Sequence, residues 1–493
     1  MATSSSRQKL REALARVVTL PVDIASLAAF RILFGLLMAA AMVRFLAKGW
    51  VAQLYVEPAF HFTYPGFEWI RPWPTALMHA HFVLLTLLAL GVAFGFFYRI
   101  CITLFFLGFA YVELMDQTTY LNHYYLISLL SGLLIFLPAH RAWSFDTWRR
   151  PEIAIEAVPA WALNILRFQV AVVYVFAGLA KLNADWLFRA EPLRIWLAAR
   201  SDLPLFGPLL GQLWVAYAAS WFGAVFDLSV VFFLLCGRTR RIAYALAVFF
   251  HVMTWLLFNI GMFPWVMLVA ATVFFPAHWP RDFLLRVSAR AGNRFKVGTS
   301  YTSPKCPEET PGKNGDSCNS SLRCVQIAGQ IPVAAAPESP LRVLPRYKIS
   351  LLLPAVCVYA AVQLALPLRS FFCAAPPAWT GAGFNCAWRV MVAEKTGYVE
   401  FYAFDPVIGR RWRLPARDYL TPRQETMMAQ DPDLIRAFAR HLAADLRKQG
   451  HPQIQIRADA FATLNGRPSQ RMIDPKVNLA ARVPGGWILP LAD

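Results

Sequence analysis

Long apolar stretches dominate this chain and constrain its fold more than any other feature. A helix that crosses a membrane needs about 20 mainly apolar residues. Apolar residues make up 57% of the 493 positions, against about 45–50% in soluble domains. We therefore predict a polytopic bundle of about nine membrane helices, at 25–46, 78–97, 100–116, 121–138, 161–182, 210–235, 240–258, 261–276 and 349–367.

The formal net charge of +19 raises the possibility of nucleic-acid binding. We exclude it because the basic residues lie mainly in loops between apolar segments and in a tail, where membrane topology and lipid headgroups explain them. Alternate loops are the more basic, which predicts a cytoplasmic N-terminus. The basic residues of the cytoplasmic loops are Arg7, Lys9, Arg11, Arg16, Arg99, Arg141, Arg149, Arg150, Arg238, Arg240 and Arg241.

Residues 368–493 follow a different pattern. Tyr398–Phe404 and Arg411–Leu414 alternate around a turn and predict a hairpin, while Asp431-Pro432 predicts a helix start. We expect a mainly α protein with a β-rich extramembrane domain. The expected parts are a cytoplasmic arm (1–24), a helical domain of about eight spans (25–285), a disordered cytoplasmic loop (286–346), a ninth span (347–367) and an external domain (368–493).

The eight cysteines form no CxxC pair and have no metal-ligand spacing with histidine, so we predict no metal site. Cys373 and Cys386 are the two that we place outside the membrane, in an oxidising compartment. They could form a disulfide. The alternative is two unpaired thiols that pack as small apolar groups.

Lys181 ends the apolar run that begins at Ile165, and charge at membrane depth is usually paired, functional or extended towards the interface. His123 and Asn259 begin or end other spans at the same face, and His251 lies two turns deeper. We predict that these groups converge, so that an imidazole beside a neutral amine could relay a proton. We expect the remaining buried charges to pair with one another: Arg31, Arg167, Glu113, Asp116, Asp185 and Asp227.

Several segments resemble, in the same order, those of vitamin K-dependent γ-glutamyl carboxylases. They are Asp23–Met38, Asn122-His123, Ala177–Trp186, Phe258–Phe263, Trp388–Met391 and Gln470–Val477. The resemblance runs from about residue 20 to 490 and excludes the 286–346 loop. Lys-Leu-Asn-Ala-Asp-Trp and Ile-Gly-Met-Phe are its most specific parts.

The resemblance implies a membrane enzyme that oxidises vitamin K hydroquinone with O₂, generating an epoxide and a strong base. The base removes a glutamate γ-proton in a bound polypeptide, and the carbanion takes up CO₂. Lys181 would deprotonate the hydroquinone, with His123 in support. We predict that the substrate or quinol contacts Tyr120, Asn122, His251, Asn259, Met262, Phe263, Phe384 and Trp388.

The implied cofactors are reduced vitamin K (phylloquinol or menaquinol), O₂ and CO₂, with no metal. The implied partners are membrane lipid, the isoprenoid quinol and an unidentified glutamate-containing polypeptide. We expect an integral protein of the bacterial inner membrane with a periplasmic C-terminal domain.

Three positions depart from the animal enzymes of this family. Ala180, Ser370 and Phe384 stand where those enzymes have lysine, histidine and tyrosine. Two alternatives therefore stay open. One is a quinol epoxidase without peptide carboxylation, and the other is a non-enzymatic membrane binding or export-associated protein.

Overall fold

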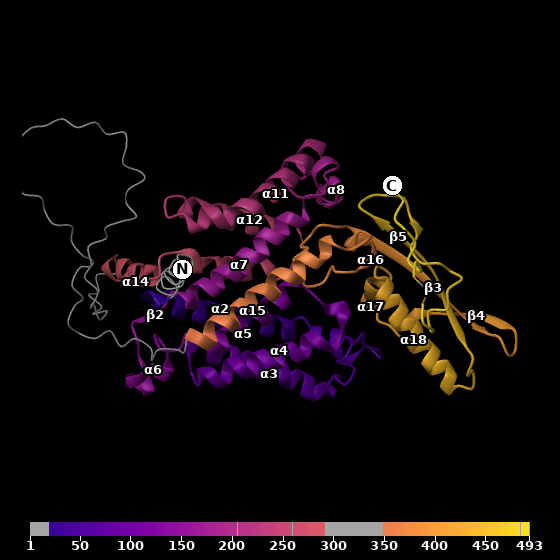
Figure 1. Cartoon of the computed structure of the whole chain (residues 1–493), viewed down its shortest axis with the longest axis horizontal. Helices are drawn as coiled ribbons and strands as arrows, with labels where there is room; N and C mark the ends of the chain where they lie inside the picture. The colour runs from indigo at the N-terminus through magenta and orange to yellow at the C-terminus, as the bar shows by residue number, and fades with distance from the viewer. Residues whose placement is uncertain (1–18, 205, 259, 291–348, 484, 493) are drawn as a thin grey trace, which may run out of the picture.

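The computed structural model describes residues 19–204, 206–258, 260–290, 349–483 and 485–492. A helical bundle precedes a smaller unit of strands and helices, which lies at one end of the bundle (Figure 1). The fold class is confirmed: the chain is mostly helical, and its strands concentrate near the C-terminus. Most of the expected 286–346 loop lies outside the described residues, although residues up to Arg290 are helical.

Seven described helices are long and apolar enough to cross a membrane, and a bent pair could add an eighth. The seven are α2 (Ala25–Ala47), α3 (Thr75–Phe94), α4 (Tyr98–Met115), α7 (Trp161–Ala180), α11 (Leu213–Leu235), α12 (Arg240–Leu257) and the segment Pro354–Phe371, which includes most of α15 (Ile349–Leu368). The bent pair comprises Phe263–Phe274 and Trp279–Arg290, at an angle of 96°.

The expected count of nine was therefore approximate, and two short helices explain the difference. Helix α5 (Asn122–Phe136) has 15 residues, or about 22 Å at a rise of 1.5 Å per residue. Helix α13 (Phe263–Ala271) has nine residues. Both are shorter than a hydrocarbon core of about 30 Å.

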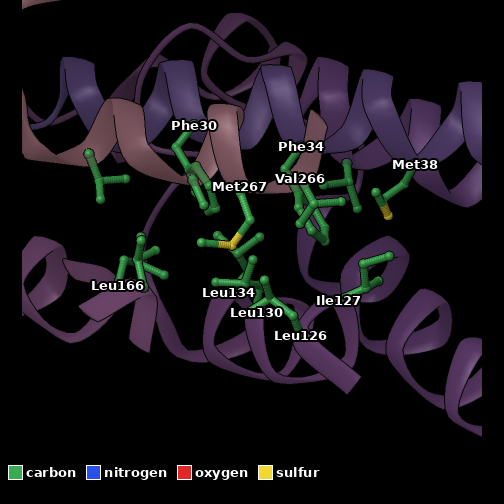
Figure 2. Packing of buried hydrophobic residues seen from close by; sticks show 14 of the residues in the cluster. Phe30, Phe34, Met38, Leu126, Ile127, Leu130, Leu134, Leu166, Val266 and Met267 are labelled. Carbon is green, nitrogen blue, oxygen red and sulfur yellow. The ribbon is translucent and has the colours of Figure 1, made fainter. Parts of the chain in front are cut away.

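The short helices lie inside the bundle, against longer ones. Figure 2 shows Phe30, Phe34 and Met38 of α2 facing α5, with Val266 and Met267 of α13 in the same layer. Helix α2 also packs along α3, and α7 packs along α11. An apolar helix need not reach water when other helices cover it, so the hydropathy of a short helix does not by itself indicate a full crossing.

Shorter elements connect the helices of the bundle. Strands β1 (Pro21–Asp23) and β2 (Ala157–Pro159) pair antiparallel beside the start of α7. The other α-helices that precede the C-terminal sheet are α6 (Phe145–Arg149), α8 (Ala184–Phe188), α9 (Leu193–Ala198), α10 (Gly207–Leu210), α14 (Trp279–Arg290) and α16 (Pro377–Thr380).

The C-terminal unit is a four-stranded antiparallel sheet in the order β4-β3-β5-β6, packed on one long helix. The predicted hairpin is present, because β3 pairs with β4 from Phe401↔Leu414 to Asp405↔Arg410. Helix α18 buries Leu434, Phe438, Leu442 and Leu446, as its sequence pattern predicts. The bounds are β3 (Lys395–Asp405), β4 (Arg410–Leu414), β5 (Gln455–Leu464), β6 (Gln470–Arg471), α17 (Pro422–Met428) and α18 (Pro432–Lys448).

Polar contacts dock this unit onto the bundle. Asp185, just beyond α7, accepts hydrogen bonds from Arg467 at 2.7 and 2.9 Å and from Asn465 at 2.9 Å. Burial alone would raise the pKa of Asp185, but the bonds from Arg467 and Asn465 outweigh burial and leave this pKa below its ordinary value. A second contact joins Gln424 of α17 to Asp116 at 2.7 Å.

The predicted mutual pairing of buried charges is wrong. Each of the six has another partner, because helix ends and polar side chains supply nearer groups. Arg31 donates to the carbonyls of Ala139, Ala142 and Trp143, and Arg167 to those of Val273 and Phe275. Glu113 accepts from Ser128, Asp116 from Thr118 and Gln424, Asp185 from Arg467, and Asp227 from Lys181.

Candidate functional site

Lys181 forms a buried ion pair with Asp227. Lys181 caps the C-terminal end of α7, and its Nζ lies 2.7 Å from Oδ2 of Asp227 in the interior of α11. The Ala177 carbonyl accepts a second hydrogen bond from Nζ at 3.1 Å. The Lys181 and Asp227 side chains are each 6% exposed. The amine is therefore neither isolated nor extended towards an interface, and it donates a hydrogen bond to a carboxylate.

This ion pair lies in the wall of an apolar cavity of about 280 Å³ between α7, α11 and α12. The Nζ of Lys181 lies 5.2 Å from the centre of the Trp186 ring, within cation–π range. The other aromatic side chains in the wall are Tyr174, Trp196, Phe222, Phe249, Phe250, Phe258 and Phe263. The cavity thus combines flat apolar surfaces with one polar corner.

His251 lines the same cavity, on α12. One of its ring nitrogens, Nε2, lies 2.8 Å from the hydroxyl of Tyr174, and the two groups share a hydrogen bond. Because Tyr174 is itself fully buried on α7, this bond fixes the orientation of the imidazole. The structure therefore brings His251 and Lys181 to one cavity, as the sequence predicts.

His123 lies in a second cavity of about 670 Å³. Its ring packs 4.5 Å from that of Tyr124 and 6.2 Å from that of Phe263. Within the described part of the chain, His123 has no hydrogen-bond partner, so its ring nitrogens are available to a ligand. A direct contact between His123 and Lys181 is not formed, because the two side chains line different cavities.

The two cavities share a wall. Five residues line both of them: Phe258, Ile260, Phe263, Val390 and Met391. The first three surround the turn after α12, where Gly261 has a φ of +63° and lies so close to His123 that an added Cβ would be 3.6 Å from its Nε2. The five shared residues therefore form an apolar partition that separates the two cavities.

The segment that leads to Val390 and Met391, the other two residues of this partition, has an unusual backbone. Cys386, Trp388 and Met391 have positive φ values of 57°, 54° and 51°. Non-glycine residues rarely adopt this conformation, and it tends to occur at functional sites. Trp388 anchors the segment, since it is fully buried and stacks on Tyr125 at 5.0 Å.

The predicted binding residues therefore divide into groups. Asn122, Met262 and Phe263 line the cavity of His123, while His251 and Phe263 line that of Lys181. Tyr120 and Trp388 line neither cavity but contact residues near them. The Tyr120 hydroxyl donates to Asn122 at 3.2 Å and accepts from the Cys386 amide at 2.8 Å. Phe384 lines neither cavity, and Asn259 lies outside the described residues.

Both candidate disulfide cysteines are free thiols in the structure. The thiol of Cys373 donates to the carbonyls of Arg369 and Ala382, at 3.5 and 3.4 Å. Burial raises the pKa of Cys386. The structure thus contains the unpaired alternative.

Sequence reasoning assigned Asp227 to general charge pairing and missed its ion pair with Lys181. A signal was available, because Asp227 is an acid within a 23-residue apolar helix, and intramembrane acids usually have a cationic partner. The pairing could not be read from the sequence, since 46 positions separate the two residues.

Two family models match the chain. One, described as the HTTM domain, matches residues 20–279, which is more than half of the chain. The other, described as the vitamin K-dependent gamma-carboxylase lumenal domain, matches residues 348–493. No solved structure matches. The first match contains both Lys181 and His123, and the second contains the Val390–Met391 part of the partition.

Proposed function

This chain belongs to the vitamin K-dependent gamma-carboxylase family, and we propose that it couples the oxidation of a reduced vitamin K quinol by O₂ to the carboxylation of glutamate in a polypeptide. The observation that carries the proposal is the Lys181–Asp227 pair in the wall of an apolar, aromatic-lined cavity. The neighbouring cavity, with His123, provides separate space for a second substrate.

The cavity of Lys181 fits the ring of a quinol. Its volume of about 280 Å³ lies just below the range for ligand sites, which is about 300–1,000 Å³. A ring and the first part of an isoprenoid chain would fill it. Phe222 and Phe249 of its wall are 42% and 56% exposed on the outer surface of the bundle, where lipid would cover them. The rest of the chain would leave through that side.

When bound, the quinol supplies the strong base through its reaction with O₂; the base removes a glutamate γ-proton, and CO₂ then adds to the carbanion. The protein's part begins with proton transfer. Nζ of Lys181 can first pass one proton to Oδ2 of Asp227, 2.7 Å away, and the neutral amine that remains can then accept the proton of a ring hydroxyl. The pair, rather than the amine alone, then stores the proton.

The apolar lining also protects the reaction. Water would quench both a strong base and a carbanion, and the cavity wall offers few polar groups to hold water. His123 would assist from the other cavity, where its free ring nitrogens can bond to substrate near the shared wall. It would therefore not act through direct contact with Lys181.

Two measurements test the proposal: epoxide formed from the quinol, and labelled CO₂ incorporated into a glutamyl peptide. Lys181→Ala should abolish epoxide formation while the protein stays folded, and Asp227→Asn should reduce it strongly because the pair loses its proton store. His123→Ala should have a smaller effect. Lys48→Ala is the matched control, because Lys48 also caps an apolar helix but is exposed.

Each outcome separates one alternative. Wild-type epoxide formation by Lys181→Ala would refute the assignment of the base. Epoxide without labelled peptide would identify a quinol epoxidase, and neither product from the wild-type protein with phylloquinol or menaquinol would favour a non-enzymatic binding protein.

We further propose that the protein lies in a bacterial inner membrane with its C-terminal unit in the periplasm. The support is the distribution of basic residues between loops, together with the presence of apolar helices long enough to cross. The glutamyl polypeptide would then approach from the periplasmic side.

A further inference from the structure

The cavity that contains His123 has a distinctive charge. Two arginines line it: Arg44, near the end of α2, and Arg423, on α17 of the C-terminal unit. Its polar residues besides these are Gln53, Asn122, His123 and Tyr124, and its described lining contains no aspartate or glutamate. The cavity is therefore cationic, in contrast to the almost wholly apolar cavity of Lys181.

Neither arginine has an acidic partner among the described residues. The guanidinium of Arg44 lies over the Trp50 ring, 4.8 Å from its centre, and forms no ion pair there. Arg467, in contrast, binds both carboxylate oxygens of Asp185. Arg44 and Arg423 thus keep donors available for an anion.

We propose that this cavity binds the side-chain carboxylate of the glutamyl substrate, with Arg44 and Arg423 as the residues that select glutamate over neutral side chains. This inference rests on the proposed function. Guanidinium groups suit the task, because they can donate two parallel hydrogen bonds to a carboxylate. Arg44 belongs to the bundle and Arg423 to the C-terminal unit, so the cavity lies between the two, where a peptide can enter. Arg423 is exposed at this entrance.

The cavity also adjoins that of Lys181. The partition of Phe258, Ile260, Phe263, Val390 and Met391 separates this cavity from that of Lys181. A carboxylate held by the arginines would leave the side-chain methylenes against apolar residues near this wall. The larger volume, about 670 Å³ against 280 Å³, also suits a peptide segment rather than a single ring.

Binding can be measured without turnover. Two fluorescent peptides, identical except for a single Glu or Gln, would be titrated against the full-length protein in detergent, with fluorescence anisotropy as the readout. The wild-type protein should prefer the Glu peptide, and Arg44→Gln or Arg423→Gln should reduce that preference about tenfold. Arg44→Lys should retain part of it, and Arg417→Gln, which removes an exposed charge of the same unit, should retain all of it.

Carboxylation kinetics add a second readout. The KM for the Glu peptide should rise in both Gln variants more than kcat falls, because the lost contact is to the bound carboxylate. Equal binding of the two peptides by the wild-type protein, or an unchanged preference in both Gln variants, would overturn the proposal. Epoxide formation by the wild-type protein is scored separately, so failure of the carboxylate site is distinguishable from failure of the quinol chemistry. Arg423 lies on the surface, so its variant remains informative if Arg44→Gln does not fold.

Discussion

Individual residues show that burial does not assign one role to every charge. Among the described residues, Arg31 is fully buried and donates to backbone carbonyls alone, whereas Lys181 is paired with a carboxylate beside a cavity. The first arrangement stabilises a loop between helices. The second leaves an amine beside space that a ligand can occupy, which is why we propose the proton-transfer role for Lys181.

Lys395, at the start of β3, allows a pH test at the residue scale. Burial lowers its pKa from 10.5 to about 8, and nearby Asp431 only partly offsets this effect. Its Nζ donates to the Trp379 carbonyl. Between pH 8 and 10.5 the unfolded lysine keeps a proton that the folded one has lost, so stability should rise with pH across this window. Below pH 8 both states are protonated, and the full cost of burying the charge is present.

We expect Lys395→Met to remove this rise, as measured by the melting temperature of the protein from pH 7 to 10.5. Lys476→Met is the control, because Lys476 is exposed. Other groups titrate in the same range, so the difference between wild type and variant is the relevant quantity. Parallel curves for wild type and Lys395→Met would contradict the prediction.

At the scale of elements, the pairing of α7 with α11 determines the site. Gly178 allows the close approach, because an added Cβ would lie 2.7 Å from Leu228 Cγ and 2.9 Å from its backbone nitrogen. Lys181 follows Gly178 by one turn, and Asp227 adjoins Leu228. The spacing of these two helices therefore controls the distance within the ion pair.

Gly178→Ala should push α7 from α11, with a loss of about 1–3 kcal/mol in the free energy of unfolding and a fall in epoxide formation. Gly132→Ala in α5 is the matched control. Its added Cβ would contact the Phe106 ring at 3.4 Å, an ordinary packing distance, so we expect stability to be unchanged or slightly raised. The prediction fails if both variants retain wild-type stability and activity.

At the scale of the whole molecule, the site depends on both parts of the chain. Val390 and Met391 complete the partition between the cavities, and Arg423 completes the cationic cavity. Asp185 and Asp116 hold the C-terminal unit against the bundle through Arg467 and Gln424. The bundle alone would therefore lack one wall of each cavity.

The orientation of the whole molecule can be tested with native cysteines. In chains that retain a single cysteine, a membrane-impermeant maleimide should label Cys373 in spheroplasts, and Cys236 only after permeabilisation. Cys373 precedes the C-terminal unit, whereas Cys236 is exposed at the far end of α11, beside Arg238 and Arg240. Labelling of Cys236 before permeabilisation, with Cys373 protected, would reverse the proposed topology.

Local patterns in the sequence determined the membrane helices, the hairpin and the amphipathic face of α18. Hydropathy and alternation depend on neighbouring residues, so they can be read along the chain. The specific motif around Lys181 indicated the family for the same reason. The expected number of spans was approximate because α5 and α13 are short, and hydropathy cannot distinguish a helix buried in protein from one that crosses lipid.

Only the tertiary structure decided what each functional residue touches. Lys181 meets Asp227, and His123 instead lies in the neighbouring cavity with Arg44 and Arg423. These relations follow from how helices distant in the sequence pack and from how the C-terminal unit docks. A residue's type and spacing specify the chemistry that it can perform, but side-chain packing between elements selects its partners.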